Sequence, residues 1–123
     1  VTLWGDAMRE HLSEGRHLLV DGFPRIVNEA RVLESALSFY HRESVHIINL
    51  ETGEDIVRER MVSRARQDDT PDSIEARLKW YREETLPVLA YYRERANTIV
   101  HDIDGTDTID GVHAQILSAL GLA

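Results

Sequence analysis

Three short apolar runs, each followed by a segment with helical spacing, constrain the fold of this chain more than any other feature. The runs are HLLVD at 17–21, VHIINL at 45–50 and TIVHDI at 98–103. The first run places three aliphatic residues in succession, which is typical of a parallel strand covered on both faces. Apolar residues recur every three or four positions over 3–13, 28–39, 52–62, 70–92 and 112–120. This alternation predicts an α/β domain of three layers, with helices on both faces of a parallel sheet.

Local signals place the boundaries of two of these helices. Thr52 and Thr70 are the expected N-caps, and Pro71 follows Thr70 at the first helical position, where a missing N–H breaks no helical bond. Pro87 interrupts the helical pattern of 70–92. We expect it to bend that helix, because proline removes one main-chain donor.

The composition restricts the number of domains and the class of function. A chain of 123 residues that is 42% hydrophobic suffices for one domain, over residues 1–123. The formal charge of −8 argues against binding of a nucleic acid polymer through a basic surface. Cysteine is absent and the six histidines are scattered, which disfavours a thiolate or histidine metal site. No apolar run approaches the roughly 20 residues of a membrane helix and no leader opens the chain, so we expect a cytoplasmic protein without a membrane partner.

Arginine is concentrated in one part of this acidic chain. Of 14 basic residues only Lys79 is lysine, and four arginines, at 58, 60, 64 and 66, fall within nine residues. Guanidinium groups gathered in one place suit bidentate binding of phosphate. The alternative is a solvated helix face laced with Glu59, and Asp68 and Asp69 could simply compensate the dipole of the helix that follows.

The segment LLVDGFPR joins the first predicted strand to a helix. Asp21 ends the strand, at the edge of a parallel sheet where ligands gather, and one carboxylate there suits hydrated Mg²⁺ beside a nucleotide. Gly22 allows the main chain to approach a ligand, Pro24 stiffens the turn, and Arg25 can bind a phosphate. Strand-Asp-Gly alone is a weak signal, whereas the string of five residues is far more specific.

That string, DGFPR, resembles a hallmark of the adenylate kinase family of nucleoside monophosphate kinases. The segment 58–95 is similar to the family's lid and following helix, with Arg-x-Arg-x-Asp-Asp-Thr and later Arg-Leu, Tyr, Thr-x-Pro and Tyr-Tyr. DIDGT at 102–106 and the last helix are similar to the family's end, so the resemblance covers essentially the whole chain. It implies a P-loop NTPase-like fold and the reversible kinase reaction ATP + AMP = 2 ADP, with Mg²⁺ as the cofactor of ATP.

The resemblance also implies residue roles on the acceptor side. Gly22, Phe23, Pro24 and Arg25 would line the AMP site, with Arg25 on the phosphate. Glu29 stands where family members read the acceptor base, usually with glutamine. Arg66 and Arg77 would clamp the phosphates between which the γ-phosphoryl group moves, and would be catalytic together with Arg64.

On the donor side the resemblance implies contacts with ATP. Arg60 would stack near the adenine, Arg64 would hold phosphates, and the segment from Gly105 to Asp107 would meet the base. Asp68 and Asp69 would orient the arginines of a lid at about 63–70. So short a segment between two helices implies the short-lid form of the family.

One departure concerns the phosphates of the donor. The family cradles them with a glycine-rich loop, G-x-x-x-x-G-K-[ST], and this sequence contains no such string. The resemblance therefore covers roughly the carboxyl-terminal two thirds of a short-lid member, without the N-terminal P-loop portion. The first strand, which the family places between strands 17–21 and 45–50, is missing with it. We expect a partial domain whose two remaining edges close up or rely on another polypeptide, which is poorly active alone and monomeric when completed.

A second departure leaves the function open between three hypotheses. An ionised carboxylate at Glu29 only accepts hydrogen bonds, which suits the exocyclic amine of adenine or cytosine, and Asn28 could read the base instead. A UMP/CMP kinase is therefore the alternative to an AMP kinase. A non-catalytic remnant that binds a nucleotide or a partner protein is the third hypothesis.

Overall fold

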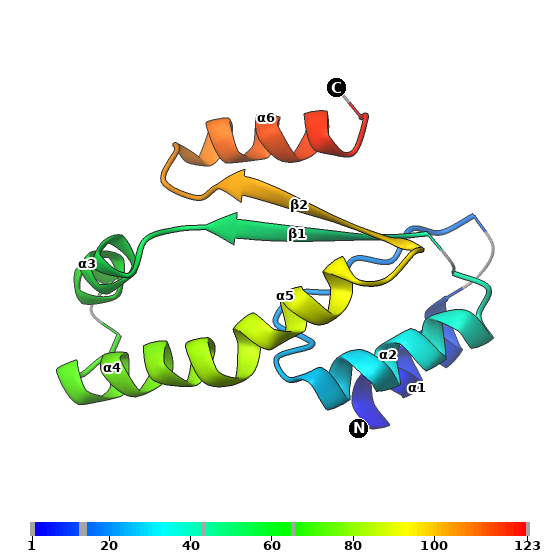
Figure 1. The fold of residues 1–123 in the computed structure, drawn as a ribbon, viewed down its shortest axis with the longest axis horizontal. Helices are drawn as coiled ribbons and strands as arrows, with labels where there is room; N and C mark the ends of the chain where they lie inside the picture. Colours follow the sequence, from blue (N-terminus) through cyan, green and yellow to red (C-terminus); the bar gives the residue numbers. More distant parts are fainter. Residues whose placement is uncertain (1, 13–14, 43, 65, 123) are drawn as a thin grey trace.

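The computed structural model describes residues 2–12, 15–42, 44–64 and 66–122. Its elements follow the chain in the order drawn in Figure 1. They are α1 (Thr2–His11), α2 (Val27–Phe39), β1 (Val45–Glu51), α3 (Glu54–Arg64), α4 (Pro71–Trp80), the π-helical segment η1 (Tyr81–Thr85), α5 (Leu86–Arg93), β2 (Thr98–Asp104) and α6 (Ile109–Ala119). The helices lie where the sequence predicts them, to within a few residues.

The sheet of the described residues consists of β1 and β2, which run parallel. Val45 lies opposite Thr98 and Glu51 opposite Asp104, so all seven residues of each strand pair in one register. Both strands are rich in β-branched residues, which favour extended main chain. The two predicted strands at 45–50 and 98–103 are thereby confirmed, and so is their parallel direction.

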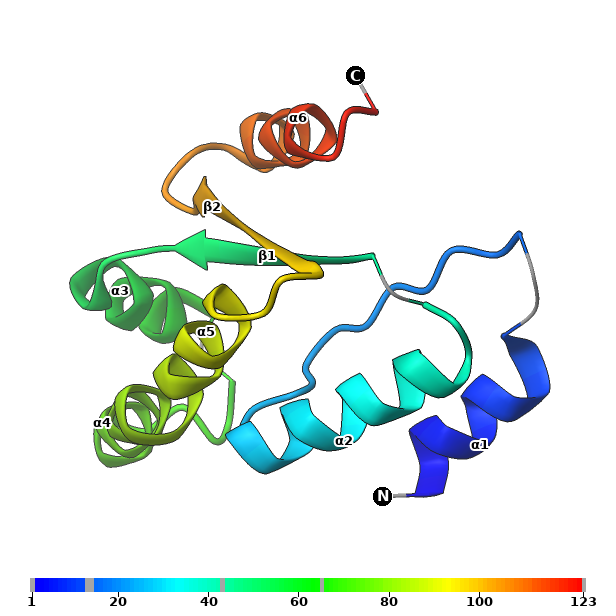
Figure 2. The same cartoon turned by 45° about the vertical axis from the view of Figure 1, so that its right-hand side comes forward.

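Helices cover both faces of this small sheet, as predicted. Figures 1 and 2 place α5 and α2 on one side of β1 and β2, and α6 on the other. On the first side, Ala30 of α2 and Val88 and Tyr92 of α5 form a buried cluster against Ile47 and Val100. Ile47 and Val100 are register partners, so one row of the sheet meets both helices. The mixed α/β class and its three layers are therefore present, around fewer strands than a complete sheet has.

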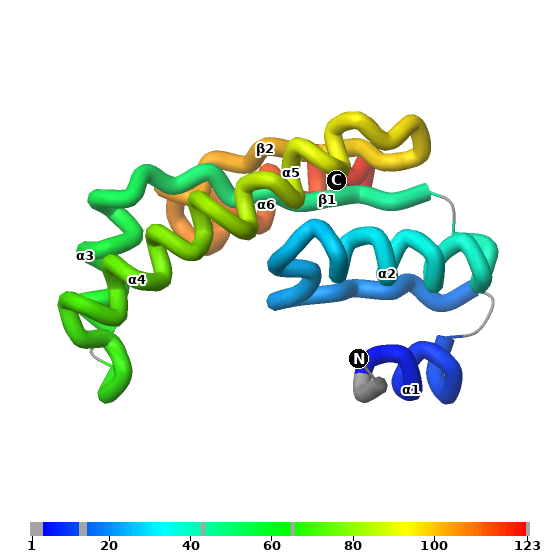
Figure 3. The backbone as a smooth tube through the Cα atoms, turned by 60° about the horizontal axis from the view of Figure 1, so that its bottom comes forward, coloured from blue at the N-terminus to red at the C-terminus, as the bar shows by residue number. Residues whose placement is uncertain are grey.

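The strand predicted at 17–21 is wrong for this structure. Residues 16–21 have no ladder partner among the described residues, and Leu19 is 92% exposed. The segment instead runs beside α2, as Figure 3 shows, and Nη1 of Arg42 donates to the carbonyl of Arg16 at 2.7 Å. A strand needs a neighbour that offers main-chain donors and acceptors, and β1 does not reach this segment. The two edges that the missing strand would separate have not closed up.

The N-termini of α3 and α4 test two predicted caps. The Thr70 hydroxyl accepts from the N–H of Ser73, the Ser73 side chain accepts from the N–H of Thr70, and Pro71 follows, which confirms that cap. Helix α3 begins at Glu54. Thr52 therefore lies two residues before the helix, and its prediction as the N-cap is wrong by one position, because the chain leaves β1 one residue later than expected.

The structure shows a change in helix type just before Pro87, where the sequence predicts a bend. Helices α4 and α5 are joined without a break by η1, in which the N–H of Leu86 donates to the carbonyl of Tyr81, five residues earlier. Within the described residues, no helix is both long and apolar enough to cross a membrane.

The packing of α6 on β2 predicts different costs for two isoleucines of that strand. Ile103 and Ile99 lie on the same face, but Ile103 is 4% exposed and Ile99 is 55% exposed. We expect Ile103→Ala to lower the free energy of unfolding by about 2–5 kcal/mol, because it leaves a cavity in the core. Ile99→Ala, the matched control, should change it by about 0.5 kcal/mol or less. Urea unfolding measures both, and equal losses would contradict this placement of α6.

Candidate functional site

The DGFPR turn holds Arg25 by both its side chain and its main chain. Gly22 has a φ of 75°, a conformation that side chains disfavour, and the Phe23–Pro24 peptide bond is cis. Nε of Arg25 donates to the carbonyl of Gly22 at 2.8 Å, and the N–H of Arg25 donates to Oε2 of Glu29 at 2.7 Å. The turn thus folds the guanidinium group back onto its own loop. One carboxylate oxygen of Glu29, the predicted base reader, is therefore occupied by the N–H of Arg25.

Asp69 joins two of the three predicted catalytic arginines. Nε and Nη2 of Arg64 donate to its two oxygens at 2.6 and 2.9 Å, and Nη1 of Arg77 donates to Oδ1 at 2.7 Å. The Asp69 side chain is 0% exposed, whereas both arginines keep more than a third of theirs exposed. Nη2 of Arg77 also donates to Asp68 at 2.5 Å. The end of α3 and the middle of α4 are thereby fixed to each other through the loop between them.

These contacts favour the charged forms of Arg64, Asp68 and Asp69. The hydrogen bond from Arg64, followed by its charge and that of Arg77, holds the pKa of Asp69 below its ordinary value. The hydrogen bond from Arg77 does the same to the pKa of Asp68. The bond to Asp69 in turn raises the pKa of Arg64. The cluster therefore carries two positive and two negative charges throughout the neutral range.

Arg60 connects α3 to the loop after β2. Its Nη1 donates to the carbonyl of Gly105 at 2.8 Å, and the N–H of Gly105 donates to the carbonyl of Glu51 at 2.9 Å. A Cβ at Gly105 would lie 2.1 Å from Oγ1 of Thr52, so only glycine fits there. Asp107 accepts from the N–H of Thr108 at the start of α6. The predicted donor-base residues thus hold this loop in place.

Three predicted site residues stand apart from these contacts. Arg66 and Asp21 are exposed, and neither forms an ion pair with another described residue. No cluster of three or more metal-binding side chains occurs within the described ranges. Arg25 lies two residues before α2, and its guanidinium group forms no ion pair with a carboxylate of the described residues. Residue 65, inside the predicted lid of 63–70, falls outside the described residues.

An open cleft of about 900 Å³ lies at the carboxyl end of β1, between that strand and α3, α4, η1 and α5. Arg77 is the predicted site residue that lines it. Glu51, Thr52, Tyr81 and Arg93 line it as well, and the sequence did not predict them as site residues. The position agrees with the rule that ligands gather at the carboxyl ends of parallel strands. Asp21 and Arg25 are not among the lining residues.

Arg93 belongs to a network that sequence reasoning missed. Its Nη2 donates to Oδ1 of Asp102 at 2.7 Å, and Nδ2 of Asn49 donates to the same oxygen at 2.9 Å. The hydrogen bonds from Arg93 and Asn49 lower the pKa of Asp102. Asn49 and Asp102 are register partners on β1 and β2, so only the strand pairing reveals the network.

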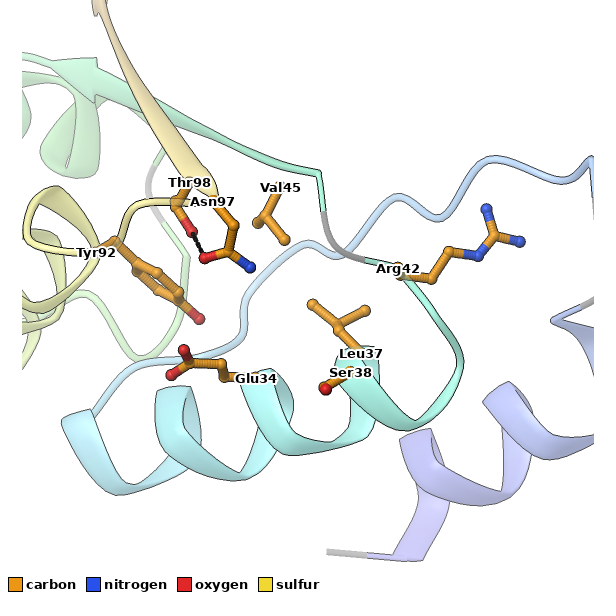
Figure 4. Close-up of a pocket in the computed structure, with 8 residues that line it drawn as sticks. All are labelled: Glu34, Leu37, Ser38, Arg42, Val45, Tyr92, Asn97 and Thr98. Carbon is orange, nitrogen blue, oxygen red and sulfur yellow. Dashed lines mark hydrogen bonds between the residues drawn. The ribbon is translucent and has the colours of Figure 1, made fainter.

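A smaller cavity of about 230 Å³ lies at the opposite end of the sheet, where both strands begin. Figure 4 shows the Tyr92 hydroxyl and the Glu34 carboxylate directed into the same space, while Arg42 extends away on the far side. Burial raises the pKa of Tyr92 to about 12, which keeps its phenol neutral. This cavity contains none of the predicted site residues.

Comparison with known proteins shows the family to which the chain is similar. A model of the family "ADK: Adenylate kinase" matches residues 1–97. The chain is 41% identical over 103 residues to the adenylate kinase of Corynebacterium diphtheriae, which covers 84% of this chain and 55% of that protein. It is 37% identical over 114 residues to the enzyme of Corynebacterium urealyticum, covering 93% and 61%, and 38% identical over 103 residues to that of Mycobacterium tuberculosis, covering 84% and 55%. The chain thus spans between half and two thirds of the length of these relatives.

The Asp69 cluster predicts a specific dependence of stability on pH. Because the folded-state pKa of Asp69 is lowered, its contribution is present above the ordinary aspartate pKa of about 4 and is lost as pH falls through the folded value. Asp69→Asn should therefore lower the urea midpoint at pH 7, and the gap from the unsubstituted chain should narrow below about pH 4. Glu59→Gln, on an exposed position of α3, is the control and should change stability by at most about 0.5 kcal/mol. A gap independent of pH would contradict the assignment.

Proposed function

We propose, since this chain belongs to the adenylate kinase family, that it supplies the acceptor turn and the short lid of a cytoplasmic phosphotransferase. The reaction is the reversible transfer of the γ-phosphoryl group of ATP to AMP, giving two ADP. The chain spans 55–61% of the length of the relatives above, so the proposal concerns its part in a complete site.

The observation that carries the proposal is the pair of arginines on the buried carboxylate of Asp69. Phosphoryl transfer requires little covalent chemistry from the protein, but it requires positive groups held in position around the moving charge. Each guanidinium has five N–H donors, and the Asp contacts use two on Arg64 and two on Arg77. The remaining donors are pre-oriented and available for phosphate oxygens. This arrangement of Arg64 and Arg77 on Asp69, the arginine fork, supports roles for both arginines in stabilising charge.

The turn at 22–25 supports the acceptor role. The guanidinium group of Arg25 forms no ion pair with a carboxylate of the described residues, so its positive charge can pair with a ligand phosphate. A nucleoside monophosphate brings two negative charges to such a group. Glu29 supports a base with an exocyclic amine, because its second carboxylate oxygen only accepts. AMP is the acceptor we propose, and the same carboxylate keeps a UMP/CMP kinase acting on CMP as the second candidate.

Asp21 is the residue that we propose to face Mg²⁺ through water. Mg²⁺ in phosphotransferases is bound by one or two carboxylates together with substrate phosphates and several waters. The carboxylate of Asp21 is exposed and has the right chemistry for such an outer-sphere contact. When bound with ATP, the ion supplies neutralisation of the phosphate charge.

The donor phosphates have no cradle in this sequence. Lys79 is the only lysine, and it lies on α4, 68% exposed and 3.9 Å from a carboxylate oxygen of Glu83. We therefore propose that the 123-residue chain alone is a poor catalyst. A non-catalytic remnant that binds nucleotide or a partner protein would have the same defect, but it gives no reason for the arginine fork on Asp69.

The acceptor role predicts the effect of two arginine-to-lysine substitutions. Titration of the chain with AMP, followed by NMR, should shift the amides of residues 22–29, and Arg25→Lys should weaken the affinity about tenfold, because lysine loses the forked contact. Arg9→Lys, on the exposed face of α1 where Arg9 pairs with Asp6, is the control and should have no effect.

Kinetic assays separate the candidate acceptors. AMP, CMP and UMP are each supplied with Mg-ATP to the chain and to a version extended by a glycine-rich loop segment. We expect turnover only from the extended version, and highest with AMP. Turnover by the 123-residue chain itself would refute the claim of poor activity, and the absence of any AMP-dependent shift would refute the acceptor role.

A further inference from the structure

The geometry points to Thr85 as a positioning residue for the Arg25 turn, an inference that rests on the proposed function. Oγ1 of Thr85 donates to the carbonyl of Arg25 at 3.0 Å, across 60 residues of sequence. In the described part of the chain, Thr85 is the one donor to this carbonyl. The carboxylate of Glu29 holds the N–H of the same residue. Two side chains thus fix the peptide groups on either side of the Arg25 Cα.

The unusual winding of η1 explains why Thr85 is available for this contact. Pro87 has no N–H, and its ring would clash with the carbonyl four residues earlier in a regular α-helix. Over Tyr81–Thr85 the helix widens to π geometry, with the N–H of Leu86 bonded to the carbonyl of Tyr81. Single π turns inside α-helices are frequent at functional sites. A threonine in a regular helix commonly bonds to its own helix, whereas here the hydroxyl reaches the separate turn.

Two other residues of η1 contact the cleft and helix α3. Tyr81 lines the 900 Å³ cleft, and Nη1 of Arg82 is bonded to Glu54 at the start of α3. Arg77 lies on α4, the helix that runs into η1 without interruption. The π-helical segment therefore lies at the junction between the lid arginines and the turn that carries Arg25. The bond between Thr85 and the Arg25 carbonyl therefore sets the distance between Arg25 and the lid arginines.

Two conservative substitutions of Thr85 test the role of its hydroxyl group. Thr85→Val removes the donor and keeps the branched shape, while Thr85→Ser keeps the donor and removes a methyl group. In the free chain, Thr85→Val should speed amide hydrogen exchange at Arg25, while exchange at Val100 in β2 and the urea midpoint stay nearly unchanged. With AMP, Thr85→Val should weaken affinity by about 3- to 10-fold, the loss of one hydrogen bond. Thr85→Ser should match the unsubstituted chain in both measurements.

The two readouts separate this inference from the proposed function. If the unsubstituted chain fails to bind AMP, the acceptor role fails, and hydrogen exchange at residues 22–29 still decides whether Thr85 positions the turn. Unchanged exchange in Thr85→Val overturns the inference, and so does an equal loss in Thr85→Ser, since the hydroxyl would then be irrelevant. A uniform rise in exchange over the whole chain, β2 included, also overturns it, because that result identifies a general role in stability.

Discussion

The parallel pairing of β1 with β2 is the constraint on which the rest of the structure depends. One register over seven residue pairs aligns the ends of both strands, so the loops after Glu51 and Asp104 meet. It also presents one row of apolar side chains to α2 and α5 and another to α6. Parallel strands need a long connection from the end of one to the start of the next, and here α3, α4, η1 and α5 form it. Every predicted site residue after position 50 is held by one of these elements or by a loop that joins them.

The predicted site contains arginines with a carboxylate partner and arginines without one. Arg64 and Arg77 are bound to carboxylates whose pKa values they lower, so their orientation is fixed before any ligand arrives. The guanidinium groups of Arg25 and Arg66 have no such partner among the described residues. The ion-paired arginines are held in a fixed orientation, and the other two carry a positive charge that no ion pair neutralises. Both properties favour binding of phosphate. This division supports the proposed roles, in which the lid arginines are oriented in advance and Arg25 is neutralised by the ligand.

Local features of this fold were predictable from sequence, and non-local ones were not. The helices, both paired strands and the Thr70 cap follow from apolar spacing and capping chemistry within a few residues. The strand at 17–21 failed because its apolar run says nothing about whether a neighbour exists to pair with it. The bonds of Arg93 to Asp102 and of Thr85 to Arg25 escaped notice because they depend on register and on the π turn. The resemblance predicts which arginines form the site, and the structure gives their partners within the chain.

Gly105 packs directly against Thr52 and Glu51, and this contact has a mechanical consequence. No side chain separates the two loops, and a main-chain hydrogen bond joins them, so neither can shift without carrying the other. Arg60 adds α3 to the same unit through the Gly105 carbonyl. A displacement of any one of these three segments is therefore expected to move the other two with it.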